Sequence, residues 1–282
     1  MIYFSGTYNT KILVDLTSTI FNNKGYVVKA VDVTKGKVED VSDFDILVIA
    51  YPIYAFNAPY PIIDYVKRLN KVSKDIKCLI LKDSGEYLSL NNASSLQLAS
   101  ILNKKNIKVF SEYHYLMPYS FVFRHTDYMA YKMLSIIKER LPLDIDDFLN
   151  GNHHYLKRFI FDRPFSFIFR VQRLGGKING KHYRIDYNKC IKCNKCLNNC
   201  PANNIKLIDD KYIFGNKCLM CQRCSVNCPK QAISVGFFKK WAIGPSYSFS
   251  EVTTYQKEVK PKYCARSYKR YFEESEKRIN HE

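Results

Sequence analysis

Residues 190–201 read CIKCNKCLNNCP, and residues 218–229 read CLMCQRCSVNCP. Both runs have the spacing C-x2-C-x2-C-x3-C-P, and Cys218 lies 28 positions after Cys190. The match extends beyond the cysteines, because Asn-Lys precedes each run and an isoleucine follows each fourth cysteine by five positions. The C-terminal half therefore contains an internal duplication of one cysteine-rich unit.

The spacing of these eight cysteines is typical of ferredoxins that carry two [4Fe–4S] clusters. Three thiolates at i, i+3 and i+6 on a tight loop can bind three corners of one cubane, whereas the fourth cysteine binds the other cluster. The proline that follows ends the local helical turn. The predicted ligand sets are Cys190, Cys193, Cys196 and Cys228 for the first cluster, and Cys200, Cys218, Cys221 and Cys224 for the second.

Two other uses of cysteine fit this pattern less well. Consecutive x2 spacings would crowd one tetrahedral zinc ion. Disulfides need an oxidising compartment, and the chain starts on a strand-like run rather than on a signal peptide. We expect a cytoplasmic protein, because no apolar run approaches the roughly 18 to 20 residues of a membrane span. Cys78 and Cys264 lie outside both runs and are assigned no ligand role.

The formal net charge of +18 is concentrated in the second half of the chain. Residues 1–150 hold 18 Lys/Arg and 16 Asp/Glu, whereas residues 151–282 hold 26 and 10. Two oxidised clusters with their thiolates would offset about four of these positive charges. The remaining excess favours an acidic redox protein as partner over nucleic acid, since no recognised nucleic-acid-binding module is present.

The first 150 residues alternate strand-like and helix-like segments. The predicted strands are 2–4, 26–33, 44–51, 76–82 and 107–113, and the predicted helices are 11–21, 62–69, 94–102 and 128–141. Strands joined by helical crossovers imply a parallel sheet with helices on both faces. We therefore predict a doubly wound α/β domain over residues 1–150.

The first strand-to-helix turn, 4-FSGTYNT-10, is rich in hydroxyl and amide side chains. Backbone N–H groups and the helix dipole favour an anion at such a turn, although an ordinary polar helix cap would have a similar composition. The turn resembles the phosphate loop of flavodoxins, T/S-x-T-G-N-T, with Tyr8 in place of the usual glycine. The resemblance implies FMN contacts by Ser5, Gly6, Thr7, Asn9 and Thr10, in a sheet of strand order 2-1-3-4-5.

Three further strand ends support a flavin site, since ligands of open α/β sheets bind at the carboxyl ends of the strands. Aromatic or apolar side chains there could stack on a flat ring, although such residues more often belong to the core. The predicted cofactor contacts at these ends are Pro52, Ile53, Tyr54, Ala55 and Phe56, then Ser84, Gly85 and Glu86, and finally Met117, Pro118 and Tyr119.

Over residues 1 to 240 the chain resembles flavodoxin–ferredoxin fusion proteins, which are also called EFR-type 4Fe–4S ferredoxins. The cysteine runs, 51-YPIYAFNAP-59 and 117-MPY-119 carry the resemblance. It implies a flavodoxin-like domain at 1–150, a small α+β ferredoxin domain with two clusters at 181–238, FMN in the first domain, and electron transfer between flavin and clusters.

Residues 151–180 form a predicted helical linker whose segment 155–170 mixes aromatic and basic residues around Pro164. We expect two short helical pieces or one kinked helix. Packing of its Phe and Ile side chains against the sheet domain is favoured over contact with a membrane surface, because the proline spoils a clean amphipathic face. Gly175-Gly176 predicts a turn into a strand at 182–186. The tail, 239–282, contains a predicted charged helix at 271–280.

Three functions are compatible with this organisation. The favoured one is an electron carrier that relays single electrons between the clusters and FMN. An FMN-dependent reductase of a small acceptor is an alternative, but no residue pattern identifies a catalytic acid or base. The third is a ferredoxin whose flavodoxin-like half has lost FMN and serves for docking.

Overall fold

The N-terminal half is built on a five-stranded parallel sheet. The computed structural model describes residues 1–252, 254, 256 and 258–281. The strands are β1 (Ile2–Tyr3), β2 (Val31–Asp32), β3 (Ile46–Pro52), β4 (Ile76–Ser84) and β5 (Ile107–Leu116). Their order in the sheet, β2-β1-β3-β4-β5, confirms the predicted α/β fold and its strand order.

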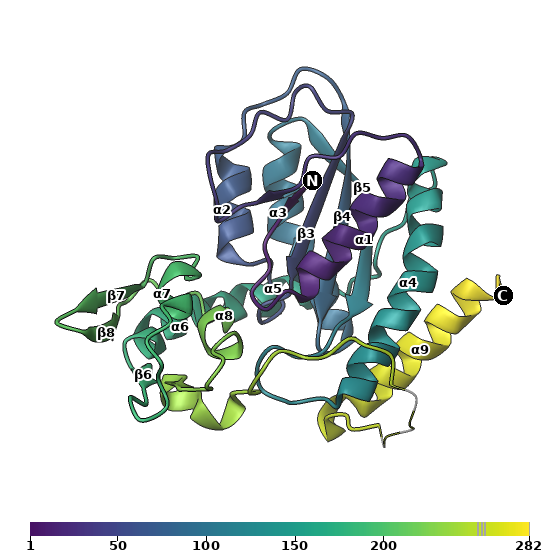
Figure 1. Cartoon of the computed structure of the whole chain (residues 1–282). Helices are drawn as coiled ribbons and strands as arrows, with labels where there is room; N and C mark the ends of the chain where they lie inside the picture. The colour runs from purple at the N-terminus through teal and green to yellow at the C-terminus, as the bar shows by residue number, and fades with distance from the viewer. Residues whose placement is uncertain (253, 255, 257, 282) are drawn as a thin grey trace.

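Helices cover both faces of this sheet, as Figure 1 shows. Helices α1 (Asn9–Asn23) and α4 (Asp127–Leu149) pack on one face, and α2 (Tyr60–Arg68) and α3 (Leu96–Asn103) on the other. The central strands are apolar along nearly their whole length because both of their sides are buried. The carboxyl ends of all five strands consequently share one edge, where the predicted flavin loops lie.

Some observed boundaries differ from the predicted ones. The strand expected at 26–33 shortens to β2, since Val27 lies on the surface with 95% of its area exposed. A 3-10 helix, η1 (Ser89–Ser95), precedes α3. Helix α4 continues past Pro142 to Leu149, with Ile145 and Phe148 buried in the extension. Burial of this apolar face therefore outweighs the backbone hydrogen bond that the proline removes.

The cysteine-rich unit contains two small antiparallel sheets and two one-turn helices. Strand β6 (Arg184–Ile185) pairs with β9 (Ile233–Ser234), and β7 (Ile205–Ile208) pairs with β8 (Lys211–Phe214). Each cysteine run contributes one helix, α7 (Lys195–Asn198) or α8 (Arg223–Val226). In Figure 1 the unit lies beside the sheet domain, near the carboxyl ends of the strands.

The linker forms three consecutive helical pieces, α5 (Asp162–Ile168), η2 (Phe169–Val171) and α6 (Gln172–Gly180). The turn predicted at Gly175-Gly176 is wrong, because both residues lie within α6. A Cβ atom on Gly176 would lie 3.1 Å from the carbonyl oxygen of Cys218, and one on Gly180 would collide with the Cys218 side chain. These glycines allow a helix to approach the second cysteine run closely.

The expected burial of linker Phe and Ile side chains is also wrong. Phe161, Phe167 and Ile168 are exposed, whereas Asp162 and Ser166 are buried against the sheet domain. Pro164 lies in the first turn of α5, where no intrahelical N–H bond is lost, so it does not break that helix. The linker thus packs mainly through its polar side, and Phe169 adds an edge-on contact with Phe56, with ring centroids 5.0 Å apart.

The tail returns to the sheet domain. Helix α9 (Ala265–Ile279) packs against α4, and its Tyr268, Tyr271 and Phe272 share a core with Leu116. It overlaps the predicted helix but begins earlier. The 3-10 helices η3 (Gly236–Trp241) and η4 (Lys262–Cys264) lie before it. Among the described residues, no helix has both the length and the apolar character needed to cross a bilayer.

Candidate functional site

The two cysteine runs have the same backbone conformation. Positive φ angles recur at residues 192, 194 and 203 (51°, 57° and 47°) and, 28 positions later, at residues 220, 222 and 231 (51°, 59° and 47°). L-residues adopt this left-handed region at an energetic cost, so its repetition marks a loop shape that both runs require. The duplication seen in the sequence therefore extends to the fold.

Backbone N–H groups approach the cysteine sulfur atoms in the same repeated way. The Asn204 N–H donates to Cys200 Sγ at 3.3 Å, and the Ala232 N–H donates to Cys228 Sγ at 3.3 Å. In the second run the Met220 N–H also donates to Cys218 Sγ at 3.4 Å. Such bonds stabilise negative charge on sulfur and tune the reduction potential of a bound cluster.

Four cysteines line one small cavity at the outer end of the unit. They are Cys190, Cys193, Cys196 and Cys228, which we call the outer cysteines. The first three come from the first run and the fourth from the second run. Cys193 is exposed and the other three are partly buried, so this group lies near solvent.

The inner cysteines, Cys200, Cys218, Cys221 and Cys224, form a second group on the side that faces the sheet domain. Burial raises the pKa of the Cys224 thiol well above its usual value, and the neighbouring Cys221, Cys218 and Cys200 raise it further. Cys221 is the most buried of the eight, with 8% of its area exposed. Four thiols gathered in a dry site are poorly suited to ionise unless a cationic centre binds them.

The donor atoms of both groups fit [4Fe–4S] clusters. Each group offers four thiols, N–H donors to sulfur, and an apolar shell that includes Ile205, Phe214 and Ile233. Within the described ranges, no three His, Cys, Asp or Glu side chains are arranged to hold a single metal ion. A [4Fe–4S] cluster does not require its ligands to meet at one metal ion, because each thiolate binds a different iron atom.

The second run docks directly on the predicted phosphate loop. Arg223 lies between two inner cysteines, and its guanidinium donates to the carbonyl oxygens of Ser5 and Gly6. The same guanidinium is 3.6 Å from the carboxylate of Asp32. A Cβ atom on Gly6 would lie 2.5 Å from the carbonyl oxygen of Cys221, so only glycine allows this approach.

A pocket of about 1060 Å³ lies between the sheet domain, the linker and the second cysteine run. Its wall on the sheet domain includes predicted flavin contacts, namely Asn9, Pro52, Ile53, Tyr54, Ala55, Phe56, Ser84, Gly85, Glu86, Pro118 and Tyr119. The facing wall is formed by residues 216–222, and α6 contributes residues 172, 173 and 175–177. The pocket is therefore shared by all three parts of the chain.

One turn of the pocket wall is held in a strained conformation by the linker. Ala55 and Phe56 have φ angles of 41° and 62°, and the backbones of Tyr54 and Asn57 bond to each other across them. The Asn57 amide donates to the Ser166 carbonyl at 2.8 Å, and the amide of Gln172 donates to the Tyr54 carbonyl at 2.7 Å. Strain of this kind persists only where the surroundings fix it, and it is common at ligand sites.

The remaining predicted flavin contacts, Ser5, Gly6, Thr7, Thr10 and Met117, do not line the pocket. The Thr7 hydroxyl pairs with that of Ser120, and the Thr10 hydroxyl donates to Asp83 at 2.5 Å. Asn9 reaches the pocket, but its amide donates to the Pro118 carbonyl at 2.7 Å.

The loop conformation itself remains compatible with an anion. Tyr8 adopts a φ of 74°, the left-handed region that glycine would enter without strain. Like the start of any helix, α1 begins with N–H groups that lack intrahelical acceptors. The side chains of Thr7, Asn9 and Thr10 are thus engaged within the protein, and the loop presents backbone N–H groups at the start of α1.

Carboxyl groups at the strand ends have altered pKa values. Burial raises the pKa of Asp83 to about 7, and the hydrogen bond from Thr10 opposes this shift. Burial also raises the pKa of Glu86. The negative charge beside the phosphate loop therefore depends on pH near neutrality.

Several residues of this site were not predicted from the sequence. Arg223, Asn57, Gln172 and Asp83 were not assigned any contact. The pocket also includes Trp241 and Tyr263 of the tail. No local pattern identifies these residues, since each gains its role from a segment that is distant in sequence.

Comparison with known protein families identifies residues 181–233 as a 4Fe-4S dicluster domain. This match supports [4Fe–4S] clusters and an iron–sulfur electron-transfer role for the C-terminal unit. No curated protein matches the chain.

Proposed function

We propose that this protein is a flavo-ferredoxin, an electron carrier in which two [4Fe–4S] clusters exchange single electrons with FMN. The outer and inner cysteines would hold the clusters, and the pocket would hold the flavin ring. The clusters supply one-electron transfer, and FMN joins one-electron to two-electron reactions. The carrying observation is that residues 218–222 of the second cysteine run line the same pocket as the predicted flavin loops.

The side chains of the pocket can orient a flat ring and exclude water. The Tyr119 ring packs on Gly85, where a Cβ atom would collide with it. The Tyr54 ring meets Phe4 edge-on, with centroids 6.0 Å apart, and lies near the inner cysteines. Leu219 and Met220 close the pocket on the side of the cysteine run. These groups would hold the ring beside the inner cluster in a site of low dielectric constant.

We propose that the cluster at the outer cysteines exchanges electrons with an acidic redox protein of the cytoplasm. Lys195 and Lys230 line the outer cavity, and the exposed Lys189 and Lys192 beside it pair with the carboxylates of Asp186 and Asp210. A basic rim around a solvent-facing cluster would steer an acidic protein to it and make the association rate fall with ionic strength.

Anaerobic purification with iron, sulfide and flavin measured per chain tests the proposal. About eight iron, about eight sulfide and one FMN are expected. About four iron would contradict the two clusters. Turnover of small acceptors by the flavin-loaded protein would instead favour the reductase alternative.

A specific observation favours a second candidate, a ferredoxin whose sheet domain binds no flavin and serves for docking. The Ser5 and Gly6 carbonyls bind Arg223, and the Thr10 hydroxyl is bound by Asp83. Full iron without flavin, and no binding of added FMN, would select this candidate.

A further inference from the structure

The linker segment 159–181 has the inverse of the usual distribution of side chains. Its buried residues are small or polar, namely Asp162, Ser166, Gly176, Asn179 and Gly180. Its apolar residues face outward, with 84% of Ile160 and 67% of Phe167 exposed. An ordinary surface helix buries its apolar side and exposes its polar side. The exposed residues of this segment are called the linker face below.

Hydrogen bonds on the buried side hold the linker face in place. The Phe159 N–H donates to the Asp162 carboxylate at 2.8 Å, and the Ser166 carbonyl accepts from Asn57 at 2.8 Å. Farther along, the Asn179 amide donates to the Val235 carbonyl at 3.0 Å. The apolar side chains are thus directed outward by contacts at both ends of the segment.

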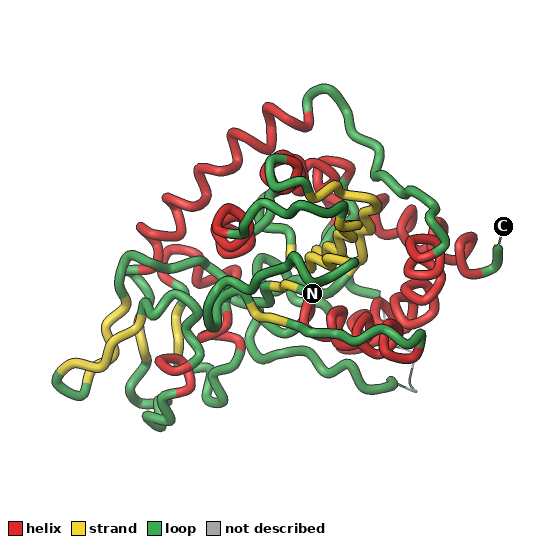
Figure 2. Tube along the Cα trace, turned by 90° about the horizontal axis from the view of Figure 1, so that it is seen from above, coloured by secondary structure: helices red, strands yellow, loops and turns green. Residues whose placement is uncertain are grey.

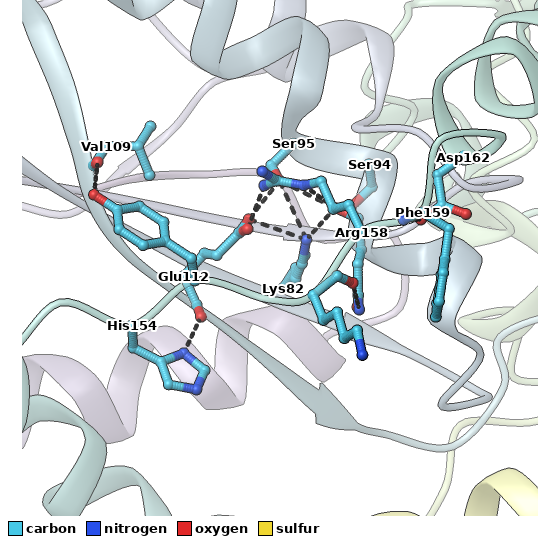
Figure 3. Close-up of polar contacts among 12 residues, drawn as sticks. Lys82, Ser94, Ser95, Val109, Glu112, His154, Arg158, Phe159 and Asp162 are labelled. Atoms are coloured by element: carbon cyan, nitrogen blue, oxygen red, sulfur yellow. Dashed lines mark hydrogen bonds and ion pairs between the residues drawn. The ribbon is translucent and has the colours of Figure 1, made fainter.

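A buried ionic network fixes the chain just before the linker face, as Figure 3 shows. Arg158 donates to the carboxylate of Glu112 and to the hydroxyl of Ser95. The fully buried Lys82 lies 3.2 Å from the same carboxylate. The chain is therefore anchored to the sheet where the linker begins. The apolar side chains that follow are exposed although the backbone beside them is held by these contacts.

The linker face is also strongly basic. Residues 159–181 contain five Lys/Arg and one acidic residue, Asp162, which is buried. Arg163 and Arg173 lie near enough to Arg170 to lower its pKa, after the larger effect of burial. Positive charge is therefore concentrated on the same short segment as the exposed aromatic and aliphatic side chains.

We propose that the linker face binds the surface of an anionic phospholipid bilayer. Aromatic and aliphatic side chains interleaved with Lys and Arg are the composition of helices that lie in the interface between headgroups and acyl chains. With 7 and 9 residues, α5 and α6 are far shorter than the roughly 20 residues of a spanning helix. Figure 2 shows this helical run along the outer edge of the molecule, open to a flat partner.

The positive charge of the linker face favours anionic lipid headgroups as its binding partner. The cytoplasmic leaflet carries a negative surface potential, which attracts basic segments close to it. An acidic protein would pair with the arginines but would leave the large apolar side chains to be covered by a matching apolar surface. A bilayer satisfies both requirements, since the apolar groups enter the acyl boundary while the basic groups meet phosphate.

Co-flotation of the anaerobically purified holoprotein with vesicles tests this proposal. Binding is expected to vesicles of phosphatidylcholine mixed with phosphatidylglycerol, weaker binding to phosphatidylcholine alone, and a decrease at high salt. Absence of binding to the anionic vesicles at low salt would overturn the proposal.

Two double variants, each with a matched control, distinguish binding by the linker face from non-specific binding elsewhere on the surface. Ile160→Ser with Phe167→Ser should reduce binding by more than tenfold, whereas Val27→Ser with Ile208→Ser, also exposed, should leave it unchanged. Arg163→Gln with Lys181→Gln should weaken binding to anionic vesicles by roughly fivefold per charge. Lys206→Gln with Lys211→Gln is the matched control on β7 and β8.

Equal loss of binding in test and control variants would overturn the proposal, because it would indicate a non-specific basic surface. The oligomeric state in solution gives an independent check. A stable dimer that Ile160→Ser with Phe167→Ser dissociates would also overturn it, since a second copy of the chain would then cover the linker face.

Discussion

The outer and inner cysteines are held by two copies of one loop that lie in different surroundings. Both loops repeat the same positive φ angles and the same N–H···S bonds. The outer group nevertheless includes the exposed Cys193 and lies beside lysines, whereas the inner group includes the buried Cys221 and borders the pocket. The duplicated loop sets the arrangement of the thiols, and the docking contacts decide what each group of thiols can exchange electrons with.

Loss of one thiol from each group should give the largest effect. Cys193→Ser and Cys221→Ser are each expected to lower iron from about eight to about four per chain, because each removes one corner ligand. Cys221→Ser should additionally loosen the domain contact, because the loop whose Cys221 carbonyl abuts Gly6 would lose the cluster that holds its shape. Iron analysis and limited proteolysis at the linker measure both effects. Equal proteolysis in the two variants would contradict the difference between the groups.

The next largest effect is expected from a methyl group added to α6 where this helix packs against the inner cysteines. Gly180→Ala would collide with the Cys218 side chain and is expected to cost about 1–3 kcal/mol of stability through overpacking. Gly175→Ala in the same helix meets nothing within 4 Å and should stabilise the helix by up to about 1 kcal/mol. Thermal unfolding of the two anaerobic holoproteins provides the test. A neutral Gly180→Ala would show that α6 does not constrain the inner loop.

Arg223 and Lys195 occupy equivalent positions, 28 residues apart, in the two loops. Arg223→Ala should lower the free energy of unfolding by about 2 kcal/mol, because buried, charge-assisted hydrogen bonds to Ser5 and Gly6 are lost. Lys195 is exposed, so Lys195→Ala should stay within about 0.5 kcal/mol of the parent. Denaturant titration of both variants checks this, and similar losses would mean that Arg223 does not secure the docking.

A further test concerns how the stability of the fold depends on pH through Asp83. Asp83 has its pKa raised to about 7 by burial, so the folded state holds its proton more tightly than the unfolded state does. Stability should therefore fall as pH rises from the ordinary carboxyl pKa of about 4 through 7. Asp83→Asn should flatten this part of the profile. Thermal midpoints measured across this range test the expectation, and an unchanged slope would assign it to another group.

The sequence was sufficient for the features that arise from local pattern. Apolar runs at βαβ spacing predicted the five-stranded parallel sheet, and the resemblance to flavodoxins implied its strand order. The cysteine spacing predicted a 4Fe-4S unit where the dicluster domain is found. Both signals are strong because each is repeated along the chain. The assignment of individual cysteines and of FMN contacts remains a prediction.

The features that were missed depend on contacts between distant segments. The fit of Gly6 against Cys221 and the bonds of Arg223 join residues more than 200 positions apart. Gly175-Gly176 has the composition of a turn, but the Cys218 backbone near Gly176 explains why a helix needs small residues there. The outward Phe and Ile of the linker could not be foreseen, because apolar residues are normally expected inside.

The contact between Arg223 and the first loop has a consequence for biosynthesis. All five strands are complete by Leu116, so the carbonyls of Ser5 and Gly6 are in place long before the ribosome reaches Arg223. Once Arg223 binds them, Cys221 is closed off from solvent. Iron that binds Cys221 would therefore have to be delivered before this docking, whereas Cys200, Cys218 and Cys224 stay partly exposed after it.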